Sequence, residues 1–294
     1  YRRTYDGASR DTIKFGEGLN SEDVLLSISG KDLLVNFKGN AEDQLILKDF
    51  MSNNTIDNFE FADGTKLDRN NFMSLDTLEG TDGADSISGY DGAETILAGT
   101  GDDSIHGNSG NDHISGEAGD DYLRGGNHND TLSGGEGSDR LYGDNHNDSL
   151  DGGSGDDYLA GGNQSDTLQG GAGNDTLVGD TISTNSTTNY YTSRFNRGND
   201  ILAGGTGTDS LSGGYGADIY IFNQGDGVDT ITEVSMSDYY RRTYDGASRD
   251  TIKFGEGIKV NDLNFEYDGA DAHVSFKGSD TDKLILKNFQ GSTL

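Results

Sequence analysis

Acidic residues at a fixed spacing of nine are the part of this sequence most able to do chemistry. From Gly80 onward fourteen nonapeptides follow one another, with one interruption, and the sixth position is acidic in all of them. Carboxylate oxygens are hard ligands that suit Ca²⁺, particularly when backbone carbonyl groups lie beside them. The candidate metal ligands, acting together with carbonyl groups of the glycine-rich turns, are Asp85, Glu94, Asp103, Asp112, Asp121, Asp130, Asp139, Asp148, Asp157, Asp166, Asp175, Asp200, Asp209 and Asp218.

Two other positions of the nonapeptide are as regular as the sixth. The first is glycine in thirteen copies, with Ala98 in the remaining one, and the eighth is isoleucine or leucine in thirteen, with Tyr220 in the last. Glycine permits the positive φ angles of tight turns, and one apolar residue per copy suits a very short strand with a single inward side chain. The copies begin at residues 80, 89, 98, 107, 116, 125, 134, 143, 152, 161, 170, 179, 204 and 213.

The repeat predicts an all-β roll. Two nonapeptides form one 18-residue coil with strands on opposite faces and six-residue turns between them, and successive coils stack as parallel strands about 4.8 Å apart. Stacking places the sixth-position carboxylates in two columns, where neighbours about 5 Å apart repel by roughly 3 kcal/mol at an effective dielectric near 20. A dication between neighbouring turns reverses the sign of this interaction. Two columns of seven turns leave about twelve gaps, so we expect roughly twelve Ca²⁺ ions.

Other metals fit this ligand set less well. Mg²⁺ demands stricter octahedral geometry, and Zn²⁺ prefers nitrogen and sulfur ligands. The chain has no cysteine, which excludes disulfide frameworks and thiolate metal sites. We therefore expect calcium to be the metal of this repeat.

Composition limits the remaining function classes. The formal net charge of −31 argues against nucleic acid and anionic membrane as partners and for cations. No apolar run is long enough to span a bilayer, so membrane insertion by this segment is not expected. GxSxG and HExxH signatures are absent, and we expect no enzyme activity. Because the chain starts at Tyr1 without a signal-peptide pattern, we expect it to be part of a longer protein.

The nonapeptide, typified by GGAGNDTLV at 170–178, resembles the GGxGxDxUx repeat of the RTX (repeats-in-toxin, haemolysin-type calcium-binding) family. The resemblance implies a right-handed parallel β-roll that binds Ca²⁺. It also implies export of an unfolded chain by type I secretion and folding outside a Gram-negative cell, as in RTX toxins and adhesins. His128, His146 and Gln164 replace glycine at the fourth position, and Glu94 replaces aspartate at the sixth. We expect these sites to be weaker or empty.

The flanks of the roll are related to each other. Residues 1–50 match residues 240–289 at an offset of 239, with 31 of 50 identical. Both copies read as short strands and resemble the haemolysin-type calcium-binding-related module, which implies caps for the open ends of a roll. We expect three domains: a cap at 1–75, the calcium-binding roll at 76–233, and a second, truncated cap at 234–294.

The duplication indicates a monomeric segment of a tandem array with a unit of about 239 residues. On this interpretation the second cap lacks the strand or strands that correspond to residues 56–67 of the first. The stretch at 67–74 predicts one short helical turn before the roll.

Three features have two interpretations each. His128 and His146 form either a stacked imidazole pair for Zn²⁺ or Cu²⁺, or simply turn residues that tolerate a glycine-like conformation. The insertion at 181–196 is either a recognition loop with exposed aromatic residues or a tolerated bulge at a turn. The arginines at 239–249 either pair with nearby carboxylates or form a docking patch; they are Arg241, Arg242 and Arg249.

Two functional hypotheses follow for a secreted or cell-surface protein. In the first, the roll folds on binding calcium after export and acts as a structural stalk or folding module. In the second, it is an adhesin-type module that recognises a glycan or a cell surface through the 181–196 loop or a face of the roll. Ice binding is disfavoured because the third position of the repeat is irregular.

Overall fold

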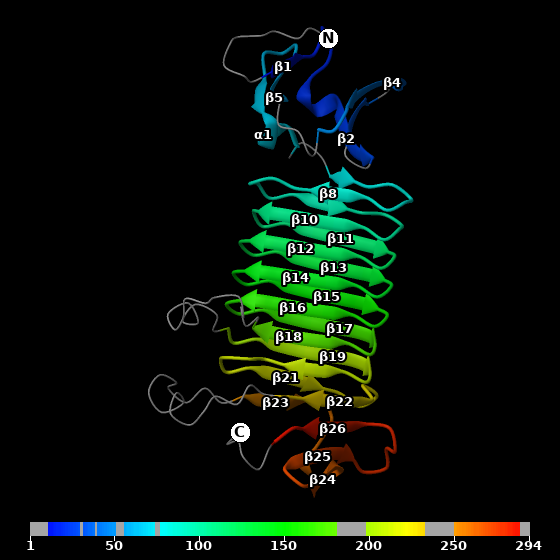
Figure 1. The fold of residues 1–294 in the computed structure, drawn as a ribbon, viewed down its shortest axis with the longest axis vertical. Coiled ribbons are helices and arrows are strands. Elements are labelled where there is room, and N and C mark those ends of the chain that lie inside the picture. Colours follow the sequence, from blue (N-terminus) through cyan, green and yellow to red (C-terminus); the bar gives the residue numbers. More distant parts are fainter. Residues whose placement is uncertain are drawn as a thin grey trace.

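A computed structural model describes residues 11–29, 32–38, 40–50, 56–73, 77–180, 198–232 and 250–288. The molecule is a tall stack of β-coils with a small β-module at each end (Figure 1). Within these ranges no helix has the length and hydropathy of a membrane-spanning segment. The predicted sites at 181–196 and at Arg241, Arg242 and Arg249 lie outside the described residues.

Two parallel sheets face each other along the stack. The first contains β8 (Ser86–Ser88), β10 (Ser104–Ser109), β12 (Tyr122–Asn127), β14 (Arg140–Asn145), β16 (Tyr158–Asn163), β18 (Thr176–Asp180), β20 (Ser210–Ser212) and β22 (Val228–Ile231). The second contains β7 (Leu78–Glu79), β9 (Thr95–Leu97), β11 (His113–Ala118), β13 (Thr131–Glu136), β15 (Ser149–Ser154), β17 (Thr167–Gly173), β19 (Ile201–Gly207), β21 (Ile219–Phe222) and β23 (Thr251–Phe254). The predicted parallel β-roll is therefore confirmed.

Pairing between coils follows the predicted register. Leu123 pairs with Leu141 one coil later, which is a spacing of two nonapeptides. After the insertion the frame resumes, because Leu168 pairs with Leu202 across β17 and β19. The eighth-position side chains form the core between the two sheets, and each is at most 2 % exposed. They are Ile87, Ile96, Ile105, Ile114, Leu123, Leu132, Leu141, Leu150, Leu159, Leu168, Leu177, Leu202, Leu211 and Tyr220.

The strands in the middle of the roll are longer than predicted. β12 has six residues and runs from the seventh position of one nonapeptide to the third position of the next. The ladder continues past the glycines, since Gly126 pairs with Asp144. Gly126 has a φ of 116° and Asp144 a φ of 77°, so the second position bends the strand without ending it. The expectation of a very short strand and a six-residue turn was wrong: the turn itself contains only the fourth to sixth positions.

The fourth position shows why glycine predominates there. Gly137 has a φ of 129°, and a Cβ on it would overlap the carbonyl group of Gly119 in the preceding coil. His128, His146 and Gln164 instead have φ angles of 78°, 79° and 74°. That is the narrower left-handed region in which non-glycine residues occur. These three turns therefore take a different backbone shape that leaves room for a side chain.

The N-terminal module consists of two three-stranded sheets, β1-β5-β6 and β2-β3-β4. Its elements are β1 (Asp11–Lys14), a 3-10 turn η1 (Ser21–Asp23), β2 (Val24–Ser29), β3 (Asp32–Phe37), β4 (Asn40–Leu47), β5 (Ile56–Glu60), β6 (Lys66–Asp68) and α1 (Arg69–Met73). Helix α1 confirms the predicted helical turn. Arg69 of this helix joins the module to the roll: it donates to the carbonyl of Phe50, and its guanidinium lies 5.2 Å from the ring of Tyr90.

The C-terminal module continues both sheets of the roll. Its elements are β23, a 3-10 turn η3 (Val260–Asp262), β24 (Leu263–Asp268), β25 (Asp271–Phe276) and β26 (Lys283–Leu286). β23 pairs in parallel with β21, and β26 pairs in parallel with β22. β25 and β24 then follow β26 as antiparallel strands.

Candidate metal sites

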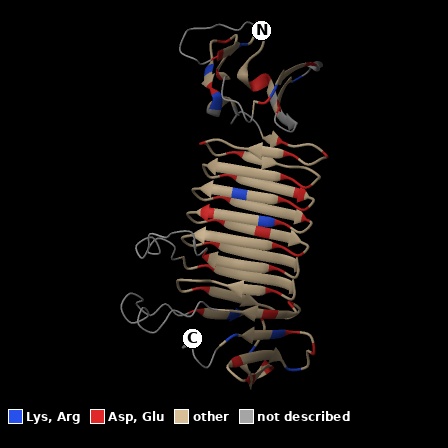
Figure 2. Ribbon diagram, viewed as in Figure 1, with Lys and Arg blue, Asp and Glu red and all other residues tan. Residues whose placement is uncertain are grey.

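The fourteen sixth-position residues all lie at the ends of strands, where the chain turns from one sheet to the other. Acidic residues line both edges of the roll at these turns (Figure 2). Although they carry carboxylates, none of the fourteen side chains is more than 6 % exposed. Burial of so many acidic groups is unfavourable unless each finds partners, so the contacts of their oxygens decide what the turns can do.

From Asp103 onward, one oxygen of each sixth-position carboxylate accepts a hydrogen bond from the backbone of the preceding coil. The N–H of Asp121 donates to Oδ1 of Asp139 at 2.8 Å, and the N–H of Asp139 donates to Oδ1 of Asp157 at the same distance. The same bond recurs along both columns and links the coils at their turns. A buried backbone N–H is thus satisfied at every step, which the sequence pattern alone did not predict.

These ladders extend beyond the nonapeptides into the C-terminal flank. The N–H of Asp209 donates to Oδ1 of Asp229 at 3.3 Å, and that of Asp218 donates to Oδ1 of Asp250 at 3.0 Å. Neither Asp229 nor Asp250 was among the predicted site residues. The signal was the tripeptide Asp-Thr-Ile at 229–231 and 250–252, which matches the sixth to eighth positions of a repeat.

The second oxygen of most of these carboxylates has no hydrogen-bond partner. Oδ2 is buried and unpartnered among the described residues in Asp103, Asp112, Asp121, Asp130, Asp139, Asp148, Asp157, Asp166, Asp175, Asp200, Asp209 and Asp218. First-position glycine leaves room beside it: a Cβ on Gly134 would overlap Oδ2 of Asp139 and touch the carbonyl oxygen of Gly152. The turns thus bring an unsatisfied carboxylate oxygen and a carbonyl oxygen together, which is the donor set that Ca²⁺ takes.

Burial makes these carboxylates hard to ionise without a cation. Desolvation raises the pKa of Asp139 to about 6, of Asp157 to about 7, of Asp148 to about 8 and of Asp166 to about 9. Neighbouring carboxylates in the same column add to the rise for Asp148 and Asp166. At neutral pH the ionised roll is therefore under electrostatic strain that a bound dication would relieve.

The first turn of each column differs from the rest. Asp85 has no free Oδ2, since that oxygen accepts from the N–H and the hydroxyl of Thr81 at 2.6 and 2.9 Å. In Glu94 one oxygen accepts from the N–H of Tyr90 at 2.9 Å, while Oε1 is buried without a partner. Of the predicted ligands, Asp85 is thus the one whose carboxylate the chain itself already satisfies.

His128 and His146, the two histidines at the fourth position of the repeat, stack on each other instead of facing a common point. The rings of His128 and His146 are parallel within 6°, with centroids 5.2 Å apart. The backbone N–H of His128 donates to Nδ1 of His146 at 3.1 Å, so this ring nitrogen already has a partner within the chain. The positive φ angles and the stack of rings favour turn residues over a metal pair. Within the described ranges, no three histidine or acidic side chains gather around a common point.

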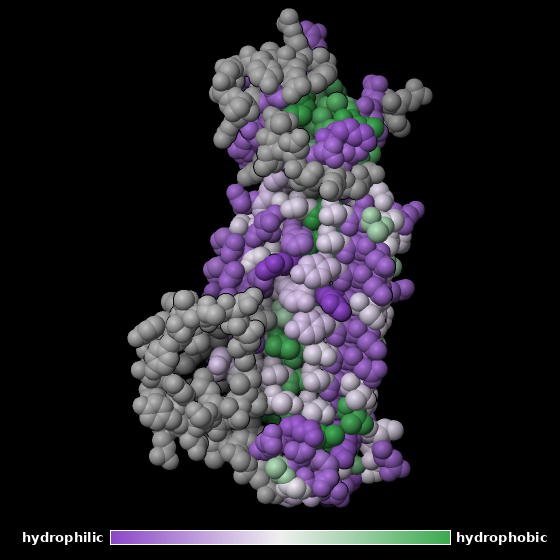
Figure 3. All heavy atoms as spheres, in the orientation of Figure 1, coloured by the Kyte–Doolittle hydropathy of each residue, from purple (hydrophilic) through white to green (hydrophobic). Residues whose placement is uncertain are grey.

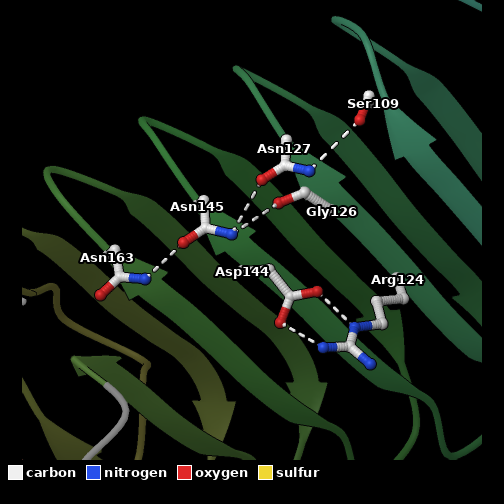
Figure 4. A network of polar contacts seen from close by, with 7 residues as sticks. All are labelled: Ser109, Arg124, Gly126, Asn127, Asp144, Asn145 and Asn163. Atoms are coloured by element: carbon white, nitrogen blue, oxygen red, sulfur yellow. Dashed lines mark hydrogen bonds and ion pairs between the residues drawn. The ribbon is translucent and has the colours of Figure 1, made fainter. Parts of the chain in front are cut away.

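Asparagines form a further ladder beside the carboxylates (Figure 4). The amide of Asn127 donates to Ser109, that of Asn145 to Asn127 and that of Asn163 to Asn145, at 3.2, 3.1 and 2.6 Å. Next to it the Arg124 guanidinium pairs with the carboxylate of Asp144 at the second position of a repeat. Residues that depart from the repeat pattern, such as Asp144, thus make contacts between coils.

Comparison with known protein families agrees with this geometry. The RTX calcium-binding nonapeptide repeat matches residues 75–105, 97–127, 124–159, 151–181 and 196–231. The haemolysin-type calcium binding protein related domain matches residues 32–71. A search of curated proteins gave no match. The parallel β-roll and its buried sixth-position aspartates agree with both family matches. The chain belongs to the RTX haemolysin-type calcium-binding proteins.

Proposed function

We propose that this RTX segment binds about a dozen Ca²⁺ ions through its sixth-position carboxylates and turn carbonyls, and that it folds because of them. The observation that carries the proposal is the set of buried Oδ2 atoms without partners, from Asp103 to Asp218. An unpaired buried carboxylate is strongly destabilising, and a dication held between successive turns would neutralise it. Bound calcium would supply the positive charge that the acidic chain lacks. The turns of the chain would hold the carboxylate and carbonyl oxygens in place around it.

The same linkage supports a role in secretion. Where free Ca²⁺ is scarce, repulsion among the acidic residues would keep the chain open, and an open chain suits type I export. Outside the cell, calcium would close the coils into a stalk that carries or folds neighbouring domains. We therefore place the protein outside a Gram-negative cell or on its surface.

A calcium titration tests the proposal. Starting from protein treated with EDTA at pH 7.5, far-UV circular dichroism should show a cooperative change from coil to β-structure on adding Ca²⁺. Chelator should reverse the change, and equal concentrations of Mg²⁺ should not cause it, because Mg²⁺ needs near-ideal octahedral geometry. A chain that is already fully β-folded in excess EDTA would contradict calcium-driven folding.

A second candidate function is recognition of a polysaccharide by one face of the roll. The rings of His106, Tyr122, Tyr142 and Tyr158 follow one another across β10 to β16, with centroids 5.3 to 5.8 Å apart. Arg140 pairs in register with Tyr122 on one side and with Tyr158 on the other. The face drawn in Figure 3 is pale over these strands, with strongly hydrophilic points among them.

Aromatic rings present flat apolar area to sugars, and a guanidinium group donates hydrogen bonds that sugar hydroxyls can accept. On the opposite sheet the corresponding positions of β13 are Thr131 and Ser133, which makes a matched control available. We expect Tyr142→Ala combined with Arg140→Ala to abolish binding to glycans on an array in Ca²⁺. Ser133→Ala combined with Thr131→Ala on β13 should leave that binding unchanged. Equal binding by both variants, or none by the parent protein, would count against this function.

A further inference from the structure

The two end modules share a sequence and a strand order, yet each buries a different side. At the offset of 239, β1 to β4 correspond to β23 to β26. In the C-terminal copy, β23 and β26 are covered by the roll end, through β21 and β22. In the N-terminal copy the corresponding β1 and β4 are edge strands of their sheets in the described part of the chain.

Among the described residues, β1 pairs along one edge only. Its other edge corresponds to the edge of β23 that pairs with the roll. β5 pairs with β1 through the N–H of Phe15, which donates to Glu60. In the C-terminal copy the N–H groups of Thr251 and Gly255 donate to β21 and the residue before it. Thr251 and Gly255 correspond to residues 12 and 16, and N–H groups alternate between the two edges of a strand. β5 and a roll end would thus take opposite edges of β1.

An apolar cleft lies where the roll end would sit. It has a volume of about 360 Å³ between β1 and β4, and Ile13, Phe15, Phe37 and Leu45 are among its lining residues. Phe15 and Phe37 meet edge to face with centroids 6.0 Å apart. In the C-terminal copy the corresponding pair has the same arrangement at 6.3 Å, and Phe222 of the roll packs against both rings.

Exposure of matching residues supports the same conclusion. Leu284 of β26 is 1 % exposed against the roll, whereas its counterpart Leu45 is only partly buried, and the adjacent Ile46 is 45 % exposed. On the other side of the module the relation is reversed. Leu26 of β2, the strand that packs on β7 of the following roll, is 3 % exposed, while its counterpart Phe265 on β24 is 60 % exposed.

We infer that the module is a two-sided connector, and that the β1–β4 side of the N-terminal copy is a socket for the C-terminal end of another roll. The partner is a second copy of this unit, which contributes the strands equivalent to β21 and β22. Its Phe222 would enter the cleft between Phe15 and Phe37, and its last two strands would pair with β1 and β4. Rolls would thus join end to end with continuous sheets.

The test opens a roll end in the folded, calcium-loaded chain. A protease site inserted within 233–249 allows the chain to be cut after folding, and diafiltration removes the released C-terminal fragment. Sedimentation velocity should then show head-to-tail oligomers that grow with concentration. Uncut protein should remain monomeric, because its own C-terminal module covers the roll end. Circular dichroism in Ca²⁺ reports separately whether the roll is folded.

A matched pair of variants separates docking from non-specific association. Leu45→Lys should weaken assembly of the cut protein by about tenfold or more, since an unpaired ammonium would be buried in the interface. Ala62→Lys adds the same side chain on an exposed turn that does not line the cleft, and it should leave assembly unchanged. Cut protein that stays monomeric after removal of the fragment would overturn the inference, as would equal assembly by the Leu45→Lys variant.

Discussion

Asp139→Asn is expected to change the stability of the roll in opposite directions with and without calcium. Without calcium, the substitution removes a buried carboxylate whose pKa is raised to about 6, and an amide can still accept the N–H of Asp121. The metal-free roll should therefore become more stable. With calcium, the loss of one anionic ligand should weaken the adjoining ion by about 2 kcal/mol or more, which is roughly thirtyfold in affinity.

Isothermal titration and dichroism together measure both effects. The variant should bind at least one Ca²⁺ ion fewer, and its folding midpoint should move to higher calcium concentration. Asp151→Asn is the matched control, because Asp151 is exposed on the outer face of β15, away from the turns. A shift of equal size in both variants would mean that net charge, rather than a ligand at the turn, controls folding.

Acidification should fold the calcium-free chain. The pKa of Asp121 is raised to about 6 in the folded roll and that of Asp166 to about 9, from an ordinary value of 3.8. A carboxyl group with a raised pKa binds its proton more tightly in the folded state, so proton binding stabilises the fold. This contribution is complete below about pH 4. It is lost progressively as the pH rises from there to the folded-state pKa of each group, which is about 6 for Asp121 and about 9 for Asp166.

Dichroism in EDTA between pH 4.5 and 8.5 checks this dependence, with β-structure expected at the acidic end. In Ca²⁺ the pH dependence of folding reverses, because protons then compete with calcium for the carboxylates. The Ca²⁺ concentration at which half of the chain is folded should rise as the pH falls. The two end modules set a lower limit to the pH range in which this experiment can be read. Asp32 and Asp271 have pKa values lowered by lysine partners, so their contribution is lost in stronger acid. A spectrum that is constant across the range would show that the buried carboxylates do not govern folding.

The roll itself could be predicted from sequence because its determinants are local and repeated. Each eighth-position Ile or Leu can only face inward if the coils stack in register, and Leu168 and Leu202 meet in that register despite the insertion between them. The carboxylate columns followed from the same periodicity. Burial of the carboxylates did not, since the period places Asp139 at a turn without saying which groups of the neighbouring coil surround it.

What escaped prediction lies where the pattern changes. Asp229 and Asp250 extend the columns, but glycine spacing lapses after Tyr220, so the nonapeptide frame no longer identifies them. Strand length was underestimated because the second position bends the strand without ending it. Asn108, Glu117 and Asp144 have positive φ angles there and still pair with the neighbouring coil. Here contacts between coils, rather than intrinsic preference, determine the backbone.

The direction of the hydrogen bonds in the roll has a mechanical consequence. Both sheets are parallel, and their ladders run along the long axis of the molecule, from one end module to the other (Figure 1). Force applied between the two ends would load these bonds along their length, so coils would peel away one after another instead of shearing together. Each 18-residue coil released would add about 60 Å of extended chain. A surface protein built this way would lengthen stepwise under flow, and it would absorb a pull that would detach a rigid tether.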